Sequence, residues 1–296
     1  MVIVPRYETC LSHTGVYNVH DQMFSIESMD KLRIVPAADY SGEGISKSLA
    51  RGLLVWYGDC NLTGEGMGIG SVALRQEECT FFSRSWTDYQ DTEIFRRTFT
   101  IDTCMKWRLR EELSPLLTSW IEMGISAYMR FPRLQNLVML PLLPLRRLFG
   151  IHPSFEMIPP LGKVTFTYRV KGHGVDVAVE SDILSKTGGH LCLLNELSAA
   201  WFTHGWDGKP APPPPGWEPV GSGNLPVSLI DPVHAIRFFL DPPIVPPHVP
   251  LTVFRGREYT GDLCWAGFCI EVGPSGDSKR YPEVRYHIGF ASGEGT

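Results

Sequence analysis

The chain has no apolar run long enough to cross a bilayer, which requires about 20 consecutive apolar residues. The nearest run covers residues 137–145, contains Pro141 and Pro144, and stops at Arg146–Arg147. We therefore expect no membrane-spanning segment. Peripheral contact with a membrane surface through residues 137–149 stays open as an alternative.

The sequence also lacks the basic surface that a general nucleic-acid-binding protein needs to displace counterions from phosphate. Its formal net charge is −5 at pH 7, and its isoelectric point is near 6.0. The densest basic positions are pairs rather than clusters, which we interpret as solvated surface. These pairs are Arg96–Arg97, Arg108 with Arg110, and Arg146–Arg147. We expect no nucleic-acid partner.

Features of an exported protein are missing as well. Residues 1–10 do not show the three regions of a secretory signal. The 7 cysteines are odd in number and form no C-x-x-C pair, so we expect reduced, mostly buried thiols in a soluble, cytoplasmic protein. They are Cys10, Cys60, Cys79, Cys104, Cys192, Cys264 and Cys269.

Sequence signatures of several enzyme classes are absent. The 9 histidines form no H-x-x-x-H or H-E-x-x-H pattern, so no zinc site is predicted. There is no G-x-S-x-G sequence for an acyl-transfer nucleophile and no G-x-x-x-x-G-K-[ST] loop for phosphates. We expect no metal and no cofactor, and the sequence leaves the oligomeric state open.

The chain does contain many segments with the composition that is typical of β-strands. Runs rich in β-branched and aromatic residues cover 52–57, 80–83, 94–101, 235–240, 251–254, 263–270 and 284–288. Residues 164–170 and 175–180 predict a hairpin, because Val175, Val177 and Val179 alternate with other side chains. Residues 191–202 fit a helix by propensity and a buried strand by their neighbourhood, so both assignments stay open.

Two segments interrupt this β pattern. Residues 113–130 carry apolar side chains at three- and four-residue steps, between Ser114–Pro115 and Pro132, which predicts a helix. Short helical turns should follow up to Pro160. The helix either packs on the sheet as core or forms a flap over a pocket. Residues 210–250 hold 13 of the 24 prolines, which predicts a long surface loop.

The expected fold is therefore mainly β. We expect an antiparallel β barrel, several barrels or a sandwich, with a helical insertion at about 108–155 and a proline-rich loop at about 210–250. Residues 1–296 should form a single compact unit. The alternative is two packed β halves, 1–107 and 160–296, bridged by a helical segment over 108–159.

A glycine-rich stretch, residues 64–70, is the most distinctive local pattern. Residues 68–73 match the G-x-G-x-x-A form of a dinucleotide fingerprint, but they follow a turn rather than a buried strand, which disfavours a nucleotide site. In a strand, glycines at every second position would let another backbone or a ligand approach closely. Gly66 and Gly68 are therefore either packed under an aromatic ring or part of a pocket floor beside Glu65.

Acids and aromatic residues give two further candidate places. Glu196 lies inside an apolar run, so its carboxyl group must be paired or have a raised pKa if that run is buried. His204, Trp206 and Asp207 follow shortly, and Asp262 with Trp265 form a second group. Such residues build a general acid/base site, but they equally build a hydrogen-bonded core edge and an Asp-Gly turn. The candidate catalytic residues are Glu196, His204 and Asp207, and the candidate ligand-binding residues are Gly66, Gly68, Trp206, Trp265 and Asp262.

Two hypotheses of different classes follow. The first is a protein that binds a small apolar molecule, lipid- or isoprenoid-like, in a β-barrel pocket. It would be either a carrier or an enzyme for proton-transfer chemistry such as hydration, isomerisation or cyclisation. The second is a structural or interaction protein whose proline-rich loop, residues 210–215 in particular, docks a partner in polyproline form.

Overall fold

The computed structural model describes residues 31–37, 51–64, 66–76, 79–90, 93–108, 152–171, 174–185, 189–206, 210–211, 216–260, 263–274 and 280–292. This part contains no α-helix, only β-strands and one short 3-10 turn, η1 (Ser222–Asn224). The strands are β1 (Leu32–Pro36), β2 (Leu53–Tyr57), β3 (Cys60–Asn61), β4 (Gly68–Gln76), β5 (Cys79–Gln90), β6 (Phe95–Arg108), β7 (His152–Lys171), β8 (Gly174–Ser181), β9 (Gly189–Leu197), β10 (His204–Trp206), β11 (Pro210–Ala211), β12 (Gly216–Val220), β13 (Val227–Asp231), β14 (Ile236–Leu240), β15 (Leu251–Thr260), β16 (Leu263–Val272) and β17 (Val284–Ser292).

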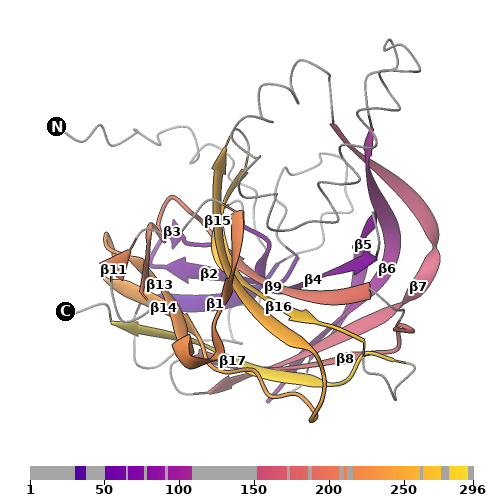
Figure 1. Ribbon diagram of the computed structural model, residues 1–296. Helices are drawn as coiled ribbons and strands as arrows, with labels where there is room; N and C mark the ends of the chain where they lie inside the picture. Colours follow the sequence, from indigo (N-terminus) through magenta and orange to yellow (C-terminus); the bar gives the residue numbers. More distant parts are fainter. Residues whose placement is uncertain are drawn as a thin grey trace.

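Antiparallel pairing joins these strands into one large, bent sheet (Figure 1). From end to end the order is β12–β15–β16–β9–β4–β5–β6–β7–β8–β17–β14–β13–β10–β11. Beside this row, β2 pairs with β4, β1 and β3. The mainly β class is confirmed, as is the hairpin at 164–180, which is β7–β8.

The sheet is not closed into a barrel, so that part of the expected fold is wrong. The end strands β11 and β12 do not pair with each other among the described residues. One physical reason is that both are short and contain proline, which lacks the N–H group that a closing ladder needs. Instead the sheet bends until distant strands face each other. The rings of Phe238 in β14 and Phe268 in β16, both fully buried, lie 4.8 Å apart.

The proline-rich segment 210–250 is also not the long loop expected, because β11 to β14 lie within it. Two of its prolines, Pro226 and Pro232, flank the strand β13 and lie outside it. Pro226 follows a cis peptide bond immediately before β13, and Pro232 begins the turn after it. The apolar side chains of Val227, Leu229 and Ile236 are fully buried. Burial of these side chains therefore stabilises strands in a segment for which the prolines predicted a loop.

The predicted helix at 113–130 lies outside the described residues, but the edges of the expected insertion are strand. β6 extends to Arg108, which pairs with His152 at the start of β7. The helical turns expected up to Pro160 are therefore wrong from residue 152 onward. The register between β6 and β7 shifts near Asp102, so Pro159 and Pro160 lie in an irregular part of the ladder that tolerates a missing N–H.

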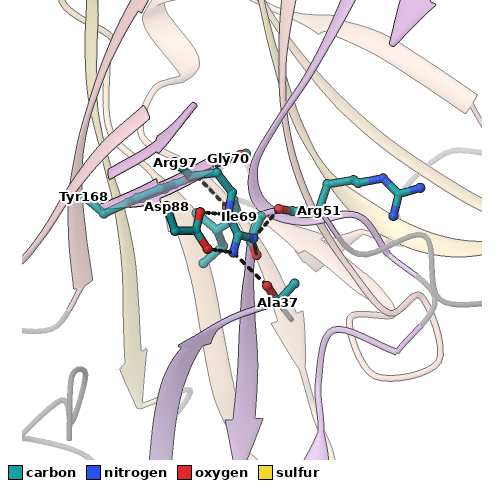
Figure 2. Close-up of polar contacts among 8 residues, drawn as sticks. Ala37, Arg51, Ile69, Gly70, Asp88, Arg97 and Tyr168 are labelled. Carbon is teal, nitrogen blue, oxygen red and sulfur yellow. Dashed lines mark hydrogen bonds and ion pairs between the residues drawn. The ribbon is translucent and has the colours of Figure 1, made fainter. Parts of the chain in front are cut away.

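Arg97 holds three parts of the sheet together, although its sequence context suggested solvated surface. Its side chain is fully buried. Its guanidinium donates two hydrogen bonds to Asp88, at 2.8 and 2.6 Å, and others to the backbone oxygens of Ala37, Arg51 and Gly52 (Figure 2). All five N–H donors are therefore used, and β6 is joined to the ends of β1 and β2.

Candidate functional site

A second, smaller apolar cluster lies on the face of β4, β9 and β16 that points away from the main core; we call it the outer cluster. The register places Leu194 opposite Cys269, and Cys192 opposite Ala73. Alternation along β9 places Glu196 on the same face as Leu194. The buried members are Ala73, Cys192, Leu194 and Cys269, and the partly buried side chains packed on them are Met67, Phe82, Trp217 and Phe254.

Glu196 is a buried carboxylate at the end of this cluster, with 6% of the residue exposed. Its Oε2 accepts a hydrogen bond from the backbone N–H of Met67 at 3.2 Å. On one side β9 places it opposite Gly68 of β4, and on the other opposite Gly267 of β16. A Cβ atom at Gly66 would lie 2.7 Å from the Glu196 carbonyl oxygen, so only glycine permits this approach.

Two tryptophans stand beside the carboxylate. Trp265 lies two residues from Gly267 on β16, which makes it a diagonal neighbour of Glu196 on the same face. Its ring stacks on Trp217 of β12 with centroids 4.4 Å apart. The Trp217 ring in turn covers Gly256, where a Cβ atom would come within 2.6 Å of it. Trp217 was missed from the sequence because the surrounding prolines suggested a loop.

At the other end of the outer cluster, the carboxylate of Glu271 contacts an arginine and a histidine side chain. Its carboxylate lies 2.7 Å from Nη2 of Arg75 and 3.1 Å from Nδ1 of His190. A hydrogen bond to Cys192, burial and the nearby carboxylates of Glu271 and Glu196 raise the pKa of the Cys269 thiol well above its usual range. Cys269 therefore stays a neutral thiol between two acids.

A buried polar network fixes the backbone next to Glu196. Oδ1 of Asn195, which points to the core, accepts hydrogen bonds from the Gly70 N–H at 3.0 Å and the Tyr286 hydroxyl at 3.2 Å. The Tyr168 hydroxyl donates to the Gly70 carbonyl oxygen at 2.8 Å. Burial raises the pKa of both tyrosines, which keeps them neutral donors. β4, β7, β9 and β17 are thus tied together at this point.

The structure brings four of the eight predicted site residues together: Glu196, Gly66, Gly68 and Trp265. His204 is exposed on β10, with its Nδ1 2.9 Å from Thr203 Oγ1. Among the described residues β10 pairs with β11 and β13 and not with β9. Asp207 and Asp262 lie outside the described residues, and nothing is described of the Trp206 side chain. Joint action of Glu196, His204 and Asp207 stays a prediction.

Glycines 68 and 70 do not open a helix, as a dinucleotide fingerprint would, because both belong to β4. Each has a positive φ, 83° and 76°, and meets a different neighbour: a Cβ atom would contact the Leu53 carbonyl oxygen at Gly68 and the Tyr168 hydroxyl at Gly70. The glycines therefore serve close packing between strands. No flat glycine strip results.

An aspartate–histidine pair, not predicted from the sequence, lies in the turn between β13 and β14. Asp231 is fully buried, and its Oδ1 accepts hydrogen bonds from the N–H groups of Val233 and His234, at 2.9 and 3.2 Å. Its Oδ2 lies 2.6 Å from Nδ1 of His234. The imidazole contacts the rings of Tyr57 and Trp201 edge-on. An Asp–Pro step before a histidine was the available signal, but Asp–Pro marks any turn.

Replacing Asp231 by alanine should lower the free energy of unfolding by about 2–3 kcal/mol, because two backbone N–H groups and an imidazole lose their charged acceptor. Urea denaturation followed by tryptophan fluorescence measures this. Asp59→Ala, at an exposed position, is the matched control and should change little. Equal stability of the two variants would contradict a structural role for the pair.

Among the described residues, no group of three or more histidine, cysteine, aspartate or glutamate side chains is arranged to hold a metal ion. Within the same ranges no helix is long and apolar enough to span a membrane. Residues 137–149 and 212–215, for which membrane or partner contact is predicted, lie outside the described part. Both contacts stay predictions.

No family model and no curated protein matches the chain. The comparison with solved structures matches the chain to "Heparinase III-BT4657 gene product", at 10% sequence identity and a TM-score of 0.40. The match covers 89% of this chain and 33% of that one.

Proposed function

We propose that this protein binds a small apolar molecule, lipid- or isoprenoid-like, at the outer cluster, with Glu196 as the polar group that the ligand meets. The observation that carries this proposal is a carboxylate with 6% exposure set among apolar and aromatic side chains, on a sheet face away from the main core. A buried acid is costly unless it is bonded or used, and sites for small molecules combine an apolar lining with few polar groups. Large side chains occupy the space between the facing parts of the sheet, so the outer face replaces the barrel interior as the place of binding.

Each neighbour of Glu196 has a definite part in this proposal. The stacked Trp217 and Trp265 offer a flat apolar wall, and Leu194 with Met67 extends it. In this proposal the Glu196 carboxylate meets a ligand hydroxyl or takes a proton from the ligand. A carrier would release its ligand unchanged, whereas an enzyme would release a hydrated, isomerised or cyclised product.

The first experiment is native mass spectrometry of the purified full chain, followed by solvent extraction of any adduct. We expect a bound lipid-like mass. For a probe of defined chemistry, fluorescence of N-phenyl-1-naphthylamine should rise on binding, and Trp265→Ala should weaken its affinity about tenfold, equal to about 1.4 kcal/mol. Tyr89→Ala removes an exposed aromatic residue elsewhere and is the matched control.

Glu196→Gln tests the role of the acid separately from the apolar contact that Trp217 and Trp265 offer. It keeps the shape of the side chain and an oxygen for the Met67 N–H, so the fold should hold. Turnover of the extracted ligand should disappear if the carboxylate accepts a proton, while probe binding persists; Glu180→Gln, exposed on β8, is the control. Unchanged probe affinity in Trp265→Ala together with a clean mass of the unbound chain would overturn the proposal.

A further inference from the structure

The row of side chains that forms the outer cluster continues past β5 onto β6 and β7. The register places Phe82 of β5 opposite Thr103 of β6, and Thr103 opposite Met157 of β7. Side chains directly opposite each other on paired strands point to the same face. The Phe82 ring also lies 6.5 Å from the ring of Phe155, which is two residues from Met157 on β7. We call the outer cluster together with Phe155 and Met157 the outer band.

The β7 end of the outer band is its exposed part. Phe155 is 50% exposed and Met157 is 73% exposed, although both continue a cluster of buried apolar side chains. The intervening Thr103 is buried, and its hydroxyl donates to Oδ1 of Asp102 at 3.1 Å. Exposed apolar side chains that extend an apolar cluster are typical of a binding surface. A molecule that covers this end must therefore be apolar where it lies.

The width of the sheet indicates how long such a molecule is. Between β9, which carries Glu196, and β7 lie the strands β4, β5 and β6 (Figure 1). Neighbouring strands are about 4.8 Å apart, so the distance from β9 to β7 is about 19 Å. The hydrocarbon of one bilayer leaflet, which a single lipid chain fills, is about 15 Å thick. A long lipid chain that crosses the strands therefore reaches from the acid to the neighbourhood of Met157.

The acid at the β9 end indicates the chemistry of the head group. From Glu196 toward β7, the side chains that contact one another are apolar: Ala73, Phe82 and Phe155. A carboxylate accepts a hydrogen bond from a neutral hydroxyl group, whereas it repels another carboxylate. The arrangement therefore suits a chain with a hydroxyl group at one end better than a fatty acid of the same length.

We infer that the ligand is a long-chain alcohol, straight or isoprenoid, whose hydroxyl group meets Glu196 and whose chain crosses β4, β5 and β6 to Phe155 and Met157. This inference rests on the proposed function, since the site is the same. It adds the class of the ligand and the direction in which the ligand lies.

The test is displacement of N-phenyl-1-naphthylamine from the full chain by octanol and by hexadecanol, both supplied as cyclodextrin complexes. Phe155→Ser and Met157→Ser should each weaken hexadecanol binding about fivefold and leave octanol binding unchanged, because only the longer chain reaches β7. Ile244→Ser, at a 69% exposed position beside β17, is the matched control and should change neither. Glu196→Gln should strengthen the binding of hexadecanoic acid about tenfold, because the repulsion between two carboxylates is removed.

Failure of this inference is distinguishable from failure of the proposed function. If Trp265→Ala weakens hexadecanol binding but Phe155→Ser and Met157→Ser do not, the outer cluster binds a ligand that does not extend to β7, and the inference is wrong. If neither alcohol displaces the probe from the wild-type chain, the proposed function fails and the inference fails with it.

Two further results would assign the exposed end of the outer band to another occupant and overturn the inference. The first is a dimer in native mass spectrometry that Met157→Ser converts to a monomer, which would indicate a second copy of the chain. The second is a lower melting temperature of Phe155→Ser with unchanged hexadecanol affinity, which would indicate packing within the chain. Circular dichroism measures the melting temperature.

Discussion

Arg97→Ala should lower the free energy of unfolding by about 3–5 kcal/mol. The change leaves Asp88 without its partner and removes the donors for three backbone oxygens, at Ala37, Arg51 and Gly52. It also empties the space beside the Trp86 ring, whose centroid lies 4.7 Å from the guanidinium carbon. Thermal unfolding followed by circular dichroism should show a melting temperature lower by about 10 °C.

The neighbouring Arg96 provides a matched control, since it is exposed on the same strand. Arg96→Ala should change the free energy of unfolding by at most about 0.5 kcal/mol. Arg97→Lys keeps the charge but has three donors instead of five, so its stability should fall between wild type and Arg97→Ala. Equal melting temperatures for Arg96→Ala and Arg97→Ala would contradict the arrangement in Figure 2.

Gly267→Ala should cost about 3 kcal/mol or more and should also disrupt the outer cluster. A Cβ atom at this position would lie 2.0 Å from the Asn195 carbonyl oxygen and 2.8 Å from the Cα atom of Glu196. Both contacts are with backbone, which cannot rotate away as a side chain can. β9 and β16 would have to separate at the very residue that carries the candidate acid.

Urea denaturation measures the stability of this variant, and N-phenyl-1-naphthylamine fluorescence measures its ligand site. Both should be impaired together. Gly223→Ala is the control, because a Cβ atom there meets nothing within 4 Å. A Gly267→Ala protein with the stability of the control would mean that β9 and β16 are further apart than described.

The sequence allowed the mainly β class and the β7–β8 hairpin to be predicted, because alternating valines in β8 bury one face and expose the other. It could not decide β9, since every residue from Leu191 to Leu197 is buried. A strand covered on both faces has no period of two for the sequence to display.

The remaining prediction errors concern contacts between residues that lie far apart in the sequence. Arg97 differs from Arg96 only in pointing inward, toward Asp88 and the ends of strands far away in the chain. Glu196 was predicted because it lies inside an apolar run, and Trp265 because it follows the acid Asp262 closely in the sequence. Trp217, in β12, and Met67, immediately before β4, pack on the same outer cluster, and only the folded sheet shows that they meet there.

The position of β4 has a consequence for how the chain folds as it is made. Gly68 in β4 pairs with Glu196 in β9, so 128 residues must be added before its neighbour exists. At about 5–20 residues per second, ribosomal synthesis takes on the order of 6–26 s to cover that distance. During this interval one edge of β4 has no strand to join. The positive-φ glycines at 68 and 70 make that edge irregular, and an irregular edge is a poor template for another nascent chain.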